Sequence, residues 1–227
     1  MTDKNVSIET LVELGPFSIT STVMTTWLIM AVIWIVAWLI SRNLKNDPGA
    51  LQTAVEGIVL AIEQAVTEVT PHNARHILPF IGTLWIFLVI ANLVGLVPGL
   101  HSPTRDLSAT AALAILVFLS THWFGIRIEG VASYLRHYLT PSPVLLPFHI
   151  ISEISRTVAL AVRLFGNIMS LEMAALLILL VAGFLAPVPI LMLHIIEALV
   201  QAYIFGMLAL IYVAGGIQSQ QQRQQKE

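Results

Sequence analysis

Residues Pro147–Leu185 read PFHIISEISRTVALAVRLFGNIMSLEMAALLILLVAGFL, an apolar run broken only by a few ionisable side chains. As a helix it would be roughly 58 Å long, against about 30 Å of hydrocarbon in a bilayer. A second run, Val188–Ile217, would be roughly 45 Å long, and only a proline-containing segment, Ala186-Pro187-Val188-Pro189, marks the boundary between the two. Because such a segment ends helices, we predict a long, strongly tilted helical hairpin, since helices of this length must tilt strongly or extend beyond the bilayer.

The composition of the chain excludes a water-soluble fold. Of its 227 residues, 57% are hydrophobic and 11% are charged, against about 25% charged in an ordinary globular protein, and the mean hydropathy is +0.85. A formal net charge of -2 leaves no basic excess to hold nucleic acid. Because the chain has no cysteine, disulfides, thiol catalysis and thiolate metal sites are excluded as well.

Three more apolar segments upstream are long enough to cross a bilayer, and they cover residues 22–40, 77–97 and 107–124. Over residues 50–70 apolar side chains recur at helical spacing, with Glu56 and Glu63 on the other side, which is typical of a helix lying on a surface. The pattern predicts an all-α integral membrane protein with five transmembrane helices plus one amphipathic surface helix.

This fold implies a single membrane domain with two polar ends. We expect a polar N-terminal tail over residues 1–21, a membrane domain over residues 22–217 whose last spans are 147–185 and 188–217, and a disordered Gln-rich tail over residues 218–227. Most basic residues outside the spans would then share one side, namely Arg42, Lys45, Arg75, Arg127, Arg136, Arg223 and Lys226, against Lys4 and Arg105 on the other. The positive-inside rule predicts the N-terminus outside and the C-terminus in the cytoplasm.

Ionisable residues within the two longest spans are the functional candidates, because a charge inside a bilayer is costly unless it has a partner, water or a function. One face of the first of these helices carries a polar stripe made of His149, Glu153, Arg156, Arg163, Asn167 and Ser170. Glu172 lies on the opposite side. By helical rise, Glu153 and Glu172 are about 15 Å and about 13 Å from Arg163, in opposite directions.

This arrangement predicts a cation pathway in two halves. Carboxylates and imidazoles accept and release protons, whereas an arginine stays protonated and repels a passing cation. Arg163 would therefore separate an acid-lined path on either side of it, and it would attract a carboxylate presented by another subunit.

Three polar residues share one face of the last span, namely His194, Glu197 and Gln201. They can meet Glu172 across the hairpin. A bend near Gly183 would bring Glu172 level with His194, and a bend near Pro187 would bring it level with Gln201.

Structural explanations stay open for some of these residues. Glu153 and Arg156 could form an ion pair at spacing i, i+3, a reading that we weigh equally with a channel role. His194 could be a buried histidine that bonds a carbonyl, with Glu197 as its ion-pair partner. Gly166 is expected to be a close-packing position, as is Gly206, rather than a site.

Four segments together resemble the a subunit of the F-type ATP synthase membrane (Fo) sector. The strongest runs from Ile151 to Asn167 and ends in Arg-Leu-Phe-Gly-Asn, and the second runs from His194 to Tyr203 and ends in Gln-Ala-Tyr. Weaker matches are Asn92–Pro98 and Pro103–Thr110. Their order on a matching hydropathy profile makes the resemblance specific from about Thr22 to Val213.

The resemblance implies an ion-translocating stator subunit of a rotary ATP synthase. In that family an essential arginine, which maps to Arg163, faces a ring of c subunits whose carboxylates carry the ions, and two offset half-channels load and unload them. The outer half-channel and the surroundings of the arginine would comprise Glu172, His194, Gln201 and Asn167, with Glu197 as an additional channel acid. The cytoplasmic half-channel would comprise Glu153 and His149, although His149 stands where the family frequently has glutamate.

Partners and location follow from the same resemblance. We expect the c-subunit ring, the b-subunit peripheral stalk and the remainder of the F-type ATP synthase complex, in membrane lipid of a bacterial plasma (inner) membrane. The translocated ion would be H⁺ or Na⁺, with protons favoured. The chain would not be an enzyme by itself, and we expect no cofactor and no metal. His72 and His76 are spaced like a metal pair but lack a third ligand, so interface packing is favoured.

The alternative function is a self-contained cation or proton antiporter, in which Arg163 and the acids form an internal binding site. Such a transporter would require inverted repeats and broken helices, and the sequence shows neither pattern.

Overall fold

The computed structural model describes residues 10–14, 17–42, 44, 49–97, 100, 102–131, 146–182 and 188–224. A short antiparallel hairpin of β1 (Thr10–Leu14) and β2 (Phe17–Thr20) opens the chain, within the segment expected to be a polar tail. The remaining elements are α1 (Ser21–Arg42), α2 (Ala50–Val69), α3 (Ala74–Val94), the 3-10 turn η1 (Pro103–Arg105), α4 (Leu107–Glu129), α6 (Leu146–Ala182) and α7 (Val188–Gln224).

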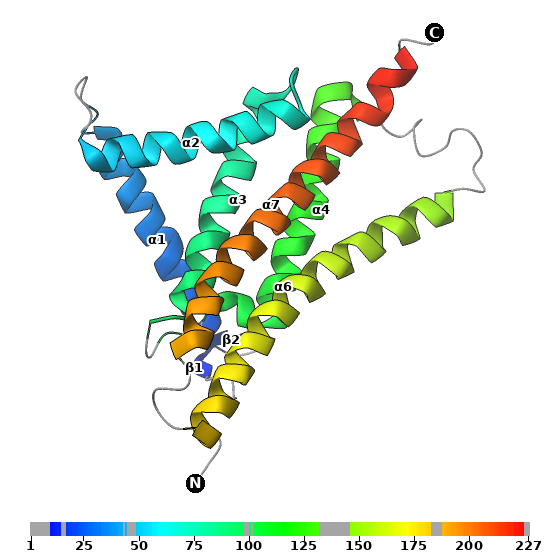
Figure 1. The fold of residues 1–227 in the computed structure, drawn as a ribbon. Helices are drawn as coiled ribbons and strands as arrows, with labels where there is room; N and C mark the ends of the chain where they lie inside the picture. Colours follow the sequence, from blue (N-terminus) through cyan, green and yellow to red (C-terminus); the bar gives the residue numbers. More distant parts are fainter. Residues whose placement is uncertain are drawn as a thin grey trace.

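Within the described ranges, five helices are long and apolar enough to cross a membrane, namely α1, α3, α4, α6 and α7, which confirms the predicted fold class. In Figure 1 the helix α2 lies across one end of these helices, and β1 and β2 lie at the other. We call these the α2 end and the η1 end, because η1 connects α3 to α4 at the latter. The helices α6 and α7 pack against each other as the predicted hairpin, and their tilt in a bilayer stays a prediction.

The core lies where α3, α4, α6 and α7 meet. Its largest fully buried side chains include Ile77, Ile81 and Leu88 of α3, Leu164 of α6 and Phe205 of α7. By contrast, α1 buries a single residue, Ile29. The bundle that holds the polar residues is therefore built from the last four apolar helices.

The helix α4 has a defined residue at each end, Asp106 beside η1 and Gly130 at the far end. Asp106 caps the start of α4, since its carboxylate accepts the backbone N–H of Ser108 at 2.9 Å. At the far end of α4, Gly130 has a φ of 85°, a conformation that a residue with a Cβ rarely adopts, and the helix ends there.

The surface helix α2 is anchored at its C-terminal end. Val66 is fully buried in the core, and the hydroxyl of Thr70 donates to the Val66 carbonyl at 2.9 Å, closing the last turn. A Cβ placed on Gly82 of α3 would lie 3.7 Å from a methyl group of Ile62, so α2 packs directly on α3.

The C-terminus differs from the sequence-based expectation. The helix α7 continues through the Gln-rich segment to Gln224, where a disordered tail was expected from residue 218. Glutamine is a good helix former, so a helix that is already packed can extend into such a segment at little cost.

Candidate functional site

The helix α6 carries the whole predicted polar stripe on one continuous element. Because it is unbroken, Glu153 and Glu172 lie about 15 Å and about 13 Å along the axis from Arg163, in opposite directions. Both acids are partly buried, whereas Arg163 is exposed. The arginine thus separates an acid toward the α2 end from an acid toward the η1 end.

Arg163 has no partner among the residues that the structure describes. No hydrogen bond or ion pair joins it to any of them, and Val158 and Val162 beside it are 54% and 53% exposed. This face of α6 is therefore open in the isolated chain.

Glu172 is paired with Arg105. From the sequence, Arg105 indicated only how the chain is oriented in the membrane. Nη1 of Arg105 donates to Oε2 of Glu172 at 3.1 Å, and the two side chains are 18% and 15% exposed. A Cβ on Gly95 would lie 3.3 Å from Oε1 of Glu172, so the missing side chain leaves room for the carboxylate. Sequence spacing could not reveal this pair, because 67 residues separate its members.

A buried polar network holds η1, and with it Arg105, against the bundle. The Thr104 hydroxyl donates to Oδ1 of Asn92 at 2.8 Å, and Nδ2 of Asn92 donates to the Ala198 carbonyl at 3.1 Å. The Ser102 hydroxyl donates to the Ala91 carbonyl at 2.7 Å. These bonds tie η1 to α3 and α3 to α7, so Arg105 is presented to α6 from an anchored turn.

Asn167 and Gln201 meet across the α6–α7 hairpin. Nδ2 of Asn167 donates to Oε1 of Gln201 at 2.6 Å. Within the described residues, Nε2 of the fully buried Gln201 and Nε2 of the buried His194 have no hydrogen-bond partner in the chain. Glu197 is partly buried, and no ion pair between it and His194 occurs in the described ranges.

The Asn167–Gln201 contact also sets the register of the hairpin. The two helices of a hairpin run in opposite directions, so the residue level with Glu172, five after Asn167, is Ile196, five before Gln201. Ile196 is two residues from His194. This register agrees with a bend near Gly183 rather than near Pro187. The bend itself falls outside the described residues.

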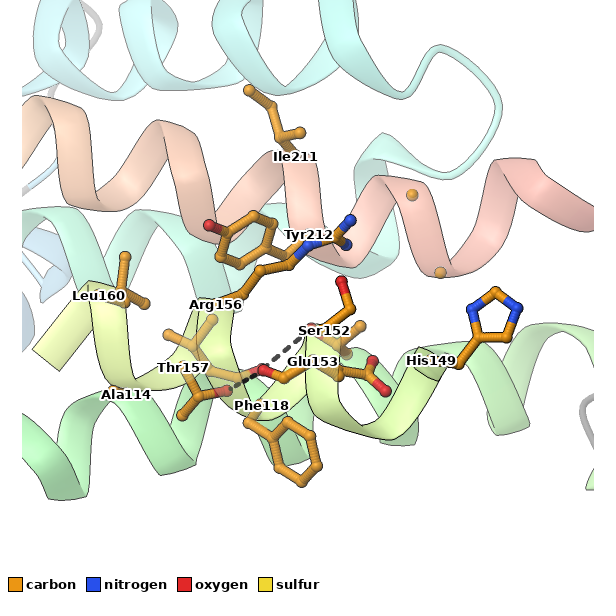
Figure 2. Close-up of a pocket in the computed structure, with 14 residues that line it drawn as sticks. Ala114, Phe118, His149, Ser152, Glu153, Arg156, Thr157, Leu160, Ile211 and Tyr212 are labelled. Carbon is orange, nitrogen blue, oxygen red and sulfur yellow. Dashed lines mark hydrogen bonds between the residues drawn. The ribbon is translucent and has the colours of Figure 1, made fainter. Parts of the chain in front are cut away.

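Toward the α2 end, α4, α6 and α7 enclose a cavity of about 500 Å³. Figure 2 shows His149 at one end of it and Leu160 at the other, with Glu153 and Arg156 between them. Tyr212 of α7 also lines this cavity. Both residues predicted for the cytoplasmic half-channel thus reach one hollow.

Within the cavity, the charges pair differently from the simplest expectation. The guanidinium of Arg156 lies over the ring of Tyr212, 5.9 Å from its centroid. Oε2 of Glu153 lies 3.7 Å from Nε2 of His122 on α4, a contact that becomes an ion pair when the imidazole is protonated, so this partner of Glu153 comes from another helix. His122 carried no spacing signal in the sequence, and only the packing of α4 on α6 brings it to the site.

The structure therefore gathers the predicted residues into two groups. Glu172, with Arg105, stands toward the η1 end, while Glu153 and His149 share the cavity toward the α2 end. Across the described ranges, no group of three or more side chains is arranged to hold a metal ion.

Comparison with known proteins adds independent findings. A family model described as ATP synthase A chain matches residues 23–214. The chain is 64% identical to ATP synthase subunit a 2 of Pelobacter propionicus, over 95% of this chain and 94% of the relative. It is similar to ATP synthase subunit a 1 of Hahella chejuensis, with 66% identity over 94% of this chain and 91% of the relative. ATP synthase subunit a of Legionella pneumophila is 57% identical, over 94% of both chains.

Proposed function

This chain belongs to the ATP synthase A chain family, and from that premise we propose that it passes cations by way of two offset half-channels separated by Arg163. Membership of the family makes it an ion-translocating component of the Fo sector and a multi-pass membrane protein. It would have no ATP chemistry of its own, because the partner subunits of the complex would supply it.

The observation that carries this proposal is the exposure of Arg163. A permanent charge on the lipid face of a helix costs from about 3 to more than about 10 kcal/mol at the bilayer centre. Arg163 is exposed in the isolated chain and has no partner among the described residues. A protein surface that presents carboxylates would remove this cost, and a ring of c subunits fits that requirement.

The two groups of polar residues then serve as the two half-channels. The Glu172 group would load or unload ions at the η1 end, and the cavity with Glu153 and His149 would do so at the α2 end. Because Arg163 stands between them and repels cations, an ion could change sides only by travelling on the ring. About 2.3 kcal/mol per charge per 100 mV is too little for one ion to drive ATP formation, so several must act in turn.

The orientation follows from the basic residues. Arg42 ends α1, Arg75 lies in the first turn of α3, and Arg127 lies in the last turn of α4, whereas Arg105 belongs to η1. The positive-inside rule puts the α2 end in the cytoplasm and the N-terminus outside. The b-subunit stalk would then reach the soluble sector from the α2 side.

Because the chain has no cysteine, a single introduced cysteine can test the partner. Val162→Cys, next to Arg163 and labelled with a thiol-reactive photocross-linker, should cross-link in native membranes to a small two-helix subunit that forms a ring. Val32→Cys on α1, which is also exposed, should not give that product. Purification of the chain alone as an active transporter would instead support the antiporter.

The identity of the ion can be settled on the purified complex. If protons are carried, ATP hydrolysis and ATP-driven acidification of vesicles should proceed without added Na⁺. A rate that depends on Na⁺, with Na⁺ uptake into the vesicles, would assign the path to sodium.

The Arg105–Glu172 pair gives a prediction for the outer half-channel. Arg105→Gln should lower ATP-driven pumping by about tenfold, because the carboxylate at the η1 end loses its cation. Arg105→Lys, which keeps the charge, should retain most of the rate, and Arg42→Gln is the matched control at the other end of the molecule. Rates are compared at equal amounts of assembled subunit. The prediction fails if Lys and Gln at position 105 behave alike.

A further inference from the structure

His122 and Glu153 join two helices at the cavity toward the α2 end. Nε2 of His122 on α4 lies 3.7 Å from Oε2 of Glu153 on α6, and the side chains are 27% and 24% exposed. Phe118 and Thr121 of α4 line the cavity together with Glu153. Both side chains are therefore partly shielded from solvent, and Glu153 borders a hollow large enough for water.

The second ring nitrogen of His122 determines its tautomer. Nδ1 lies 2.9 Å from the carbonyl oxygen of Phe118. A carbonyl can only accept a hydrogen bond, so Nδ1 carries the hydrogen. In the neutral imidazole, Nε2 then carries a lone pair, which faces the carboxylate oxygen of Glu153. Two acceptors face each other, and an added proton converts this contact into an attractive one.

The surroundings of the pair are polar on each packed helix. His149 and Arg156 of α6 line the same cavity, as does Tyr212 of α7, and the next charged residue of α4 is Arg127. The cavity extends along α6 as far as Leu160, which is three residues from Arg163. Figure 2 shows Glu153 and Thr157 between the His149 and Leu160 ends of this hollow.

We propose that His122 and Glu153 together form a proton-holding site, which takes up protons from the solution at the α2 end and releases them toward Arg163. The inference rests on the proposed function and deepens it. The Nε2 lone pair accepts a proton from a hydronium ion or a buffer acid, which becomes water or the conjugate base. The imidazolium is held by the Glu153 carboxylate. The imidazolium then gives the proton to the Glu153 carboxylate, which lines the cavity and releases it to cavity water for transfer to a ring carboxylate, and the neutral tautomer of His122 is restored.

The site is needed most when protons are scarce. In ATP-driven pumping, protons enter from the cytoplasmic side, so a holding site matters little in acid and greatly in alkaline medium. An ion pair that only clamps α4 to α6 exists only while His122 is protonated, so its removal would matter less, and not more, in alkaline medium. The pH dependence of the variant, relative to the wild type, therefore separates the two roles.

The experiment uses inside-out vesicles that contain the whole complex, because their medium contacts the cytoplasmic half-channel. His122→Gln, Glu153→Gln and the double variant are compared with the wild type by ATP-driven acidification, per assembled subunit. The wild-type to variant ratio should rise from about one near pH 6 to about tenfold near pH 8.5. The double variant should be no worse than either single one, because both remove the same site. His72→Gln and Glu63→Gln, which are exposed and do not line the cavity, should give a ratio of about one throughout.

A ratio that does not rise with pH would overturn the inference, and so would multiplicative losses in the double variant. If the glutamine variants do not assemble, Glu153→Asp should show a smaller loss with the same pH dependence, and a flat profile for it overturns the inference equally. Vesicles carrying Arg163→Ala are measured in parallel. Normal pumping there would remove the proposed function itself, whereas an inactive Arg163→Ala beside pH-independent His122 and Glu153 variants would remove only the holding site.

Discussion

Replacing Arg163 with alanine should leave the complex assembled and lower ATP-coupled ion transport by at least about a hundredfold, the order expected when a fixed charge at a reacting centre is removed. Assembly should survive because the side chain is exposed and makes no hydrogen bond or ion pair with the described residues. Transport should fail because nothing then holds the two half-channels apart electrostatically or attracts the partner carboxylate.

The measurement is ATP-driven pumping and ATP synthesis in vesicles, together with the amount of subunit in the membrane. Without the arginine, ions could also pass without turning the ring, so the passive ion leak through Fo is measured after the soluble sector is removed. Arg75→Ala, an exposed arginine at the start of α3, is the matched control and should pump normally. Normal coupled pumping by Arg163→Ala would contradict the assignment.

Gly206→Ala should have the second largest effect, and it should act on folding rather than on transport. A Cβ on Gly206 of α7 would overlap the indole ring of Trp85 on α3. That ring cannot move away easily, because Trp85 is only 6% exposed. It stacks on the ring of Tyr203, with the two ring centroids 6.1 Å apart, and its Nε1 donates to the Tyr203 carbonyl oxygen at 3.3 Å. Forcing α3 and α7 apart should cost about 3 kcal/mol or more.

At that cost, the amount of assembled subunit should fall more than about tenfold. Gly57→Ala is the matched control, because no other described side chain lies within 4 Å of a Cβ there, and alanine favours the helix α2. Trp85→Leu added to Gly206→Ala should restore part of the assembly by making room. A Gly206→Ala subunit that accumulates and pumps at wild-type levels would show that α3 and α7 are not in close contact at this position.

The two glycines named in the sequence analysis have different surroundings. A Cβ on Gly206 would overlap Trp85, as expected at a packing position, whereas a Cβ on Gly166 would have no atom within 4 Å among the described residues. The sequence does not distinguish them, because a small residue in an apolar helix looks the same whether or not a neighbouring helix covers it. Gly166 lies one turn from Arg163 on α6, so it would meet the proposed partner at the same face.

Helical periodicity made much of the candidate site predictable. The unbroken apolar run placed Glu153, Arg163 and Glu172 on one helix, and the rise per residue determined their spacing along its axis. The hairpin register remained open in the sequence, because it depends on where the chain bends. The contact of Asn167 with Gln201 decides between the alternatives.

The sequence by itself therefore determined which segments are apolar enough to cross the membrane, and which charges lie together on one helix. Both are local properties, set by hydropathy and by about 100° of rotation per residue. Only the tertiary structure decided which charges meet. Arg105 reaches Glu172 from an anchored turn, and His122 reaches Glu153 from a neighbouring helix. Such contacts depend on how separate helices pack, and no spacing along the chain records that.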